Sequence, residues 1–178
     1  MTAAALLLSV PVGAQQFTVK TNVITLAALS PELGAELITG EHTSVSLSLL
    51  GAWHPYRQDI ELFVVRPEFR YWFNGRPITR EYIGIAAFGA GYDMDLNAHI
   101  YRGNALALGL TGGYVFSLNR RISLELGAGT GLLFFRQKQY LREDRYEQSF
   151  TGDRSAVNAY GYRIFPIKLE LCLSYILF

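Results

Sequence analysis

The 178-residue sequence has a single cysteine, Cys172, so it cannot form an internal disulfide. Neither sign of charge is in excess: 16 Lys and Arg against 15 Asp and Glu leave a net charge of +1, which gives no electrostatic case for nucleic-acid binding. The sequence has no run of about 18 apolar residues, which excludes a helical membrane protein. Only 17% of the residues are charged and half are hydrophobic, which excludes a disordered chain. The length suits one domain.

The first residues are typical of an export signal. Residues 3–14, AAALLLSVPVGA, form a short apolar segment that ends in small residues. Val12 and Ala14 occupy the −3 and −1 positions of a signal-peptidase site, although a basic segment before the apolar stretch is missing. We expect residues 1–14 to be a signal peptide with a truncated start and residues 15–178 to form the barrel described below. The alternative is a buried N-terminal helix.

Strand-favouring residues are abundant, with 11 Phe, 11 Tyr and 17 Gly among many β-branched residues. Short connections alternate with mostly longer ones, which we place at 56–60, 96–103 and 137–162. An even number of strands joined in this way is typical of outer-membrane barrels. We therefore predict an all-β fold, an eight-stranded antiparallel up-and-down transmembrane β-barrel with both termini in the periplasm. The eight expected strands are 17–28, 33–39, 44–55, 61–73, 81–94, 104–117, 122–136 and 163–177.

Most of these runs alternate between a bulky apolar face and a small or charged face. The last run has Lys168, Glu170, Cys172 and Ser174 on one face. The interior of an eight-stranded barrel is barely wide enough for side chains, so the bulky face cannot point inward. We expect the small and charged faces to line the lumen and the bulky faces to contact outer-membrane lipid. In the last run the bulky face comprises Phe165, Ile167, Leu169, Leu171, Leu173, Tyr175 and Leu177.

Aromatic residues gather near the ends of the expected strands, as in the two interfacial belts of a membrane barrel. The periplasmic belt would contain Tyr71, Phe73, Tyr114, Phe116 and Tyr175, and the outer belt Trp53, Phe63, Tyr92 and Phe134.

Eight charged residues fall on the inward faces, four of each sign. In a narrow lumen an unpaired charge carries a penalty of several kcal/mol. The balance therefore indicates a closed plug of ion pairs, not a pore. The predicted network consists of Lys20, Glu36, Arg66, Glu68, Arg70, Glu125, Lys168 and Glu170.

Several segments resemble a Bacteroidota outer-membrane β-barrel family of unknown function that is often encoded beside fimbrillin-type genes. They are VKTN at 19–22, LSPELGAE at 29–36, RPEFRYW at 66–72 with FNG after it, and LSYILF at 173–178. The resemblance spans nearly all of the mature chain. It implies an eight-stranded barrel in the outer membrane and provides no catalytic residues.

The C-terminus looks like the signal read by the barrel-insertion machinery. Lys168, Leu173, Tyr175 and Phe178 match its polar, apolar, aromatic and terminal aromatic positions. The sequence departs from that signal in two ways: Glu170 stands where a small or apolar residue is usual, and three residues follow Tyr175.

We find no strong catalytic, metal or cofactor motif. His42, His54 and His99 are scattered and lack metal-ligand spacing. Ser46 and Ser48 share a strand with His54, but their inward parity and their distance along the strand make a poor nucleophile–base pair. GAGTG at 127–131 resembles a phosphate loop in letters only, because it lies within a strand.

The last long connection is the clearest candidate for binding a partner. It is rich in Tyr and Arg, which are the usual anchors of binding surfaces. The strands on either side could continue outward as a hairpin with a free edge that adds a partner strand. An ordinary solvated loop is the alternative. The candidate residues are Tyr140, Arg142, Arg145, Tyr146, Phe150 and Arg154.

These observations together predict a non-enzymatic outer-membrane barrel that presents surface loops for structural, adhesion or fimbria and envelope-assembly interactions. A surface or fimbrial protein is the expected partner. Two alternatives stay open: a barrel enzyme that modifies lipid A, and a secreted lipocalin-like lipid carrier. The carrier would need its bulky apolar residues inside and its polar residues outside.

Overall fold

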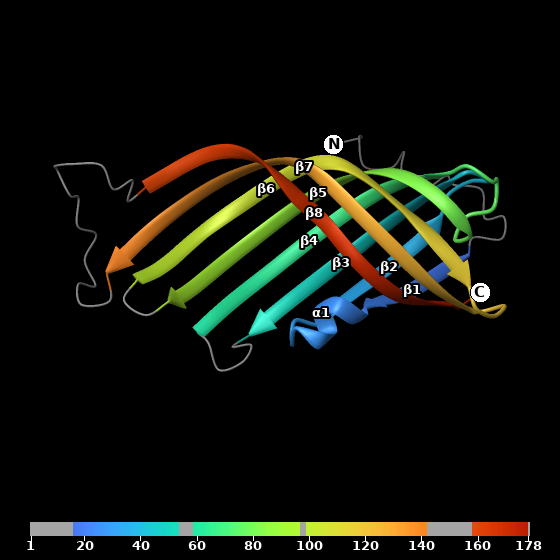
Figure 1. Ribbon diagram of the computed structural model, residues 1–178, viewed down its shortest axis with the longest axis horizontal. Helices are drawn as coiled ribbons and strands as arrows, with labels where there is room; N and C mark the ends of the chain where they lie inside the picture. The colour runs from blue at the N-terminus through green and yellow to red at the C-terminus, as the bar shows by residue number, and fades with distance from the viewer. Residues whose placement is uncertain (1–15, 54–58, 97–98, 142–157, 178) are drawn as a thin grey trace, which may run out of the picture.

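The computed structural model describes residues 16–53, 59–96, 99–141 and 158–177, so the expected signal peptide lies outside the described residues. The described chain closes into an antiparallel barrel in which each strand pairs with its neighbours in sequence and β8 pairs with β1 (Figure 1). The predicted eight-stranded up-and-down topology is thus confirmed. In the described part of the chain, no helix is long and apolar enough to cross a membrane. The elements are β1 (Phe17–Asn22), α1 (Val23–Ala27), β2 (Glu32–Ile38), β3 (Thr43–Trp53), β4 (Asp59–Trp72), β5 (Arg80–Leu96), β6 (His99–Ser117), β7 (Ile122–Leu141) and β8 (Asn158–Ile176).

The two ends of the barrel differ. Three tight connections, at 39–42, 73–79 and 118–121, lie at one end together with the start of β1 and the end of β8. We call this the turn end, at the right of Figure 1, and the opposite end the loop end. The strands β4 to β8 run far toward the loop end, whereas β1 and β2 stop partway along the barrel.

The first strand is shorter than predicted. We expected a strand over 17–28, but β1 ends at Asn22 and the helix α1 follows. The Asn22 side-chain oxygen accepts a hydrogen bond from the Ile24 N–H at 3.1 Å, which is the geometry of a helix N-cap. Leu29 then adopts a left-handed conformation with φ of 55° and turns the chain toward β2. Local capping therefore outweighs the strand propensity of VITLA.

Two connections between strands are shorter than predicted, because the strands on either side of them are longer. The connection expected at 96–103 is mostly strand, because β5 and β6 stay paired up to Leu96 and His99. Likewise, β7 and β8 continue into the region expected as a loop, with Lys138 still opposite Asn158. Backbone pairing continues past the apolar segments because the ladder bonds do not depend on apolar side chains.

The side-chain alternation follows the prediction along most strands. On β4, Phe63 and Phe69 are about half exposed, while Arg66, Glu68 and Arg70 between them are buried. Strand β8 is the exception, because a register shift opposite Gly129 and Thr130 moves its pairing from Lys168 to Pro166. Ile167, which we predicted to face lipid, is consequently buried inside the barrel. Phe165 likewise lies near Phe88, with ring centroids 6.5 Å apart.

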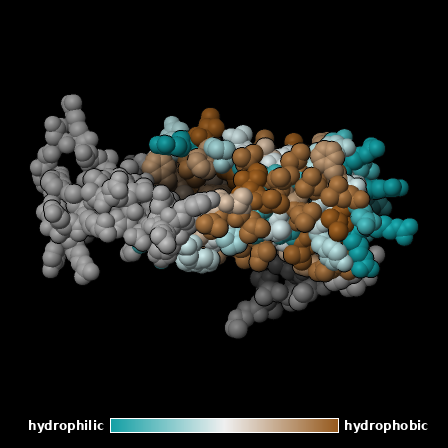
Figure 2. Space-filling model, turned by 60° about the horizontal axis from the view of Figure 1, so that its bottom comes forward, coloured by the Kyte–Doolittle hydropathy of each residue, from teal (hydrophilic) through white to brown (hydrophobic). Residues whose placement is uncertain are grey.

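The outer wall carries a bounded apolar band, which Figure 2 shows on one face. On β4 the band extends for nine residues, from Phe63 to Tyr71. Polar residues follow at the turn end of the band, and these gather at the right of Figure 2. At the loop end the outward positions change to polar residues on four adjacent strands: Glu61 lies opposite Asp93, and Asn104 lies opposite Arg136.

The aromatic residues of the predicted belts lie near both edges of this band. Trp53, Phe63 and Phe134 are exposed near the loop end, and Tyr71 and Tyr175 near the turn end. Tyr92 does not join the outer belt. It lies opposite Leu62 and shares the inward parity of that strand position. The same alternation that gives β5 its inward positions therefore turns this ring into the barrel.

Candidate functional site

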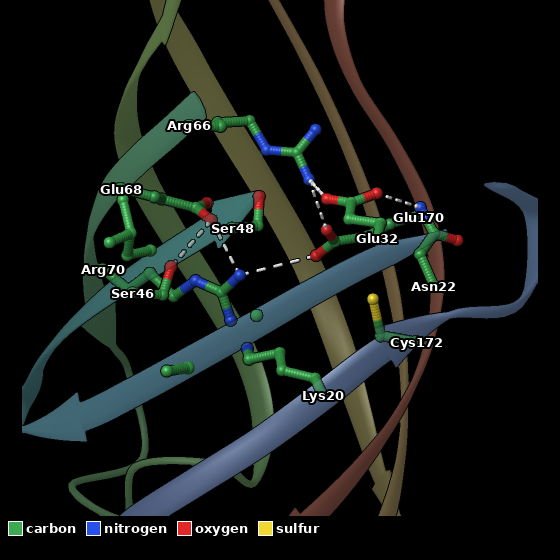
Figure 3. Close-up of a pocket in the computed structure, with 13 residues that line it drawn as sticks. Lys20, Asn22, Glu32, Ser46, Ser48, Arg66, Glu68, Arg70, Glu170 and Cys172 are labelled. Atoms are coloured by element: carbon green, nitrogen blue, oxygen red, sulfur yellow. Dashed lines mark hydrogen bonds and ion pairs between the residues drawn. The ribbon is translucent and has the colours of Figure 1, made fainter. Parts of the chain in front are cut away.

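The eight predicted lumen charges all lie inside the barrel, between the walls formed by β1, β2, β4, β7 and β8. None is more than 8% exposed. They are brought together from strands far apart in sequence because each occupies an inward position at a similar height. Figure 3 shows part of this group, which we call the charge network.

Arg70 is the centre of the charge network. Its guanidinium lies 3.1 Å from Glu36, 2.7 Å from Glu68 and 2.8 Å from Glu125. Lys168 binds Glu68 at 2.9 Å and Glu170 at 2.6 Å. Four of the network's carboxylates, those of Glu36, Glu68, Glu125 and Glu170, each form ion pairs with at least two cations, which offsets the penalty of burying charge.

A second part of the network joins β1 to its neighbours. The Lys20 ammonium forms ion pairs with Glu36 and, at 2.9 Å, with Glu125. Ser44 donates a hydrogen bond to Glu36 from β3. The shortest strand of the barrel is thereby tied through the lumen to β2 and β7.

One charged member, Glu32, was not predicted. It is 4% exposed and forms an ion pair with Arg66 at 2.5 Å. The described network therefore has five carboxylates and four cations. We had placed Glu32 in the first connection, whereas it begins β2. Its separation of four residues from Glu36 gives it the same inward parity, and this signal could have found it.

Neutral side chains complete the network. The Tyr82 hydroxyl donates to Glu125 at 2.6 Å and accepts from the Lys168 ammonium at 2.9 Å. Thr111 donates to Glu68 at 2.5 Å. A cavity of about 20 Å³ lies beside Arg70 and is large enough for one water. Among the described residues, Arg70 Nε has no hydrogen-bond partner.

An apolar floor closes the lumen on the turn-end side. Trp72, Ile78, Tyr82 and Val115 form a cluster in which each residue is at most 3% exposed. The rings of Trp72 and Tyr82 lie 5.0 Å apart. The Arg70 guanidinium lies 4.5 Å from the centre of the Tyr82 ring, so a cation–π contact joins the floor to the charge network.

The lumen is also apolar on the loop-end side of the network. Ile167, from the bulge of β8, packs there with small and large side chains of β5, β6 and β7. Ala52 and Val64, from β3 and β4, are buried as well and have inward parity. We call this the apolar layer; its cluster contains Ala86, Ala107, Leu133 and Ile167, with Phe88, Ala105 and Phe135 packed against them and only partly buried.

In the described part of the chain, β1 and β2 both end before they reach the level of the apolar layer. β1 pairs with β8 only up to Asn22 opposite Cys172, and β2 pairs with β3 only up to Glu32 opposite Leu50. Beyond that level, the described part of the chain has no strand between β8 and β3. At about 4.8 Å per strand, three spacings separate the two by roughly 14 Å. We call this region the two-strand gap. At the edge of the gap nearest the turn end, α1 packs against β8.

Polar side chains satisfy part of the β8 edge that faces the gap. The Asn22 amide accepts from Leu171 N–H at 3.3 Å and donates to Leu169 C=O at 3.4 Å. Arg66 reaches across the lumen and donates to Ile167 C=O at 3.4 Å. Pro166 has no N–H to satisfy, which suits an edge. The backbone of this edge is thus satisfied at Leu171 and Leu169, at Ile167 and at Pro166 without a partner strand.

The candidate surface residues are mostly beyond the described chain. Tyr140 lies near the end of β7, opposite Ile100 of β6. The other five, Arg142, Arg145, Tyr146, Phe150 and Arg154, lie outside the described residues.

Ser46 and His42 each make contacts within the fold. Ser46 is buried and donates to Glu68 at 3.4 Å. His42 lies in the 39–42 turn, where its Nδ1 is 2.8 Å from the Trp72 carbonyl and its ring stacks on Tyr71. His54 lies outside the described residues. The glycines of the GAGTG segment lie within β7, where Gly131 pairs opposite Gly109 of β6.

Comparison with known proteins identifies one family. No curated protein and no solved structure matches the chain. A family model described as a protein of unknown function, DUF3575, matches residues 1–177. The chain therefore belongs to the DUF3575 family of unknown function, and its described part is a closed eight-stranded barrel.

Proposed function

We propose that this protein is a non-enzymatic outer-membrane barrel that presents its loop-end strands and connections at the cell surface. The observation that carries the proposal is the bounded apolar band on the outer wall. Its nine residues on β4 agree with the about 9–11 residues of a tilted strand that crosses a membrane. In water, half-exposed side chains such as Phe63, Phe69 and Ile85 would form a large apolar surface that soluble monomers rarely carry.

The interior supports a sealed barrel instead of a channel. A permeating ion would have to pass the Trp72 and Tyr82 floor and then separate ion pairs that hold Arg70 and Lys168. Dismantling a buried network of this kind costs several kcal/mol for each uncompensated charge. The barrel thus acts as a rigid platform for its outer segments.

The segment best placed for presentation is the β7–β8 hairpin. At Arg136 the outer wall becomes polar, yet β7 continues to Leu141 and β8 starts at Asn158. This part of the hairpin would project beyond the lipid. The connection between the strands carries five of the six candidate binding residues named above, whose Tyr and Arg side chains suit a protein partner.

The sequence resemblance adds the class of partner to this proposal. A fimbrial or other envelope-assembly protein would bind the projecting hairpin. The barrel-insertion machinery would read the last strand, where Leu173 and Tyr175 face outward and are exposed. Lys168, by contrast, is buried in the charge network, so it would be available to that machinery only before the barrel closes.

Cell fractionation combined with surface proteolysis tests this proposal. We expect the protein in the outer-membrane fraction, with protease cleavage in intact cells confined to the loop-end connections. Replacing residues 142–157 by a two-residue turn should preserve the barrel and abolish partner capture from solubilised outer membranes. Recovery in the soluble periplasmic or secreted fraction would refute the membrane location, and undiminished partner capture by the shortened protein would refute the role of the hairpin.

A further inference from the structure

We infer that the apolar layer binds an acyl chain of an anionic membrane lipid, which enters sideways through the two-strand gap. The inference rests on the proposed membrane location, because the chain would come from the surrounding outer leaflet. It adds a ligand class and a binding site to the proposed role of the barrel.

The two-strand gap lies at the same height along the barrel as the apolar band, and not on the loop-end side of the band. On β8 the outward apolar positions extend from Tyr175 to Tyr162, and Tyr162 pairs with Phe134 at the loop-end edge of the band. β1 accompanies only the part of this strand between Ile176 and Cys172. Most of the in-membrane length of β8 therefore has, among the described residues, no strand neighbour on the side of the gap. Lipid chains at this height would lie directly beside the missing wall.

The edge of the two-strand gap nearest the turn end is apolar on its outer surface. The short helix α1 has no buried residue, and its Val23, Ile24 and Leu26 are 41–51% exposed. In a membrane these side chains would contact lipid tails at the level where β1 and β2 end. An acyl chain could therefore move from the bilayer over α1 without crossing a polar rim on that side.

The lumen at the same height suits an acyl chain. Leu133 lies opposite Arg163 of β8, so the apolar layer and the unaccompanied part of β8 share one level. Phe165 is 37% exposed although it lies beside the inward Phe88. The inward Ala105 and Phe135 are also only partly buried. The barrel's own side chains therefore leave apolar surface uncovered here, in contrast to the fully packed floor.

Charge points to an anionic head group. Among the described inward side chains on the loop-end side of the charge network, Arg163 is the only charged one. It is exposed, and its guanidinium lies 5.2 Å from the centre of the Phe135 ring at the margin of the apolar layer. A chain that extends from this margin toward Ala107 would leave its phosphate or carboxylate near Arg163, where a guanidinium can bind it bidentately.

The test uses phosphatidylcholine vesicles that contain phosphatidylglycerol with a photoreactive diazirine at the end of one acyl chain. The refolded full-length protein is irradiated in these vesicles, and labelled residues are identified by mass spectrometry. Outward residues such as Leu132 and Ile164 should be labelled in any membrane barrel and serve as the internal control. The inference predicts additional labelling of inward residues, above all Phe88 and Phe165. Labelling confined to outward residues would overturn it.

Two matched pairs of variants sharpen the result. Ala105→Trp fills part of the apolar layer and should abolish inward labelling, whereas Ala128→Trp, on the lipid face of β7, should leave it unchanged. Arg163→Gln should lower inward labelling by phosphatidylglycerol several-fold and leave that by an equivalent phosphatidylcholine probe unchanged. Arg136→Gln, at an exposed outward position, should affect neither. Equal inward labelling in both members of each pair would contradict the site.

Flotation of the same vesicles separates this inference from the proposed location. Protein that floats with the vesicles but is labelled only on outward residues overturns the acyl-chain site and leaves the membrane location standing. Protein that does not float overturns the location and sideways entry together.

Discussion

The guanidinium of Arg70 on β4 and the carboxylate of Glu125 on β7 meet at 2.8 Å in the middle of the lumen. Glu125 also accepts hydrogen bonds from Lys20 at 2.9 Å and from Tyr82 at 2.6 Å. One carboxylate thus holds together β1, β4, β5 and β7. The network therefore fixes the cross-section of the barrel as well as closing it.

Replacing Glu125 by Ala should destabilise the barrel strongly and open no channel. Removal of one partner from a buried ion pair leaves uncompensated charge, at a cost of about 3–5 kcal/mol. The floor of Trp72 and Tyr82 would still close the lumen. Urea unfolding in detergent micelles, followed by the mobility shift of folded barrels in gels, measures the stability. Recordings in planar bilayers measure conductance.

Glu61→Ala is the matched control for this prediction. Glu61 is exposed on the outer wall, so its removal should change the unfolding free energy by no more than about 0.5 kcal/mol. A steady large conductance of the Glu125→Ala protein would show that the charge network alone seals the barrel, contrary to the role given to the floor.

Asn22 should be the most sensitive polar residue of the gap. It caps α1 through Ile24 N–H and also bonds the β8 backbone at Leu169 and Leu171. Asn22→Ala loses a helix cap, worth about 0.5–2 kcal/mol, and leaves backbone groups unsatisfied at about 1–3 kcal/mol. Hydrogen exchange of the Leu171 amide should accelerate in the variant.

The matched comparison for Asn22 is Asn74→Ala, which removes a similar bond to Arg76 N–H in an exposed turn. Its effect on stability should be smaller, because water can replace that bond. Equal protection of Leu171 in wild type and Asn22→Ala would show that Asn22 does not satisfy this edge.

Much of the fold could be predicted from the sequence, because each side chain of a barrel strand points either into the lumen or outward. Once bulky faces are excluded from a narrow lumen, Arg66, Glu68 and Arg70 can only point inward, and the structure places them there. The same rule fails where a local irregularity changes the parity. Pro166 and the register shift on β8 reverse the faces of Phe165 and Ile167, and no alternation pattern reveals such a shift.

The end of β1 could not be predicted for a different reason. The segment Val23–Ala27 contains good strand formers, yet it forms a helix that the Asn22 side chain caps. The two-strand gap depends on that ending, whereas the apolar layer depends on the register shift that turns Ile167 inward. The gap could therefore be recognised only once the pairing of β1 with β8 was known.

The glycines of GAGTG should prove structural. A Cβ atom at Gly131 would lie 2.8 Å from the Gly109 Cα and 2.5 Å from the Leu108 carbonyl oxygen, both of them backbone atoms. Because backbone cannot move aside easily, Gly131→Ala should reduce the yield of folded barrel and its resistance to urea. Gly112→Ala, whose Cβ would approach nothing closer than 3.5 Å, is the control on the neighbouring strand. Wild-type behaviour of both variants would contradict a packing role.

Tyr82 links the floor to the charge network, and two substitutions separate these roles. Tyr82→Phe keeps the ring beneath Arg70 but removes the hydroxyl that bonds Glu125 and Lys168. Leaving those buried groups without this partner should cost about 1–3 kcal/mol while the lumen stays closed. Tyr82→Ala also removes the ring from the floor, at about 3–5 kcal/mol.

Bilayer recordings distinguish the two Tyr82 variants. We expect no conductance from Tyr82→Phe, because its floor remains complete, and brief low-conductance openings from Tyr82→Ala. Tyr71→Phe, on the exposed outer wall, controls for loss of a tyrosine hydroxyl. Openings in Tyr82→Phe equal to those in Tyr82→Ala would mean that the hydroxyl contacts, and not the apolar ring, close this end of the lumen. A silent Tyr82→Ala protein would instead show that the ion pairs suffice, since Arg70 and Lys168 would then block the lumen without the ring beneath them.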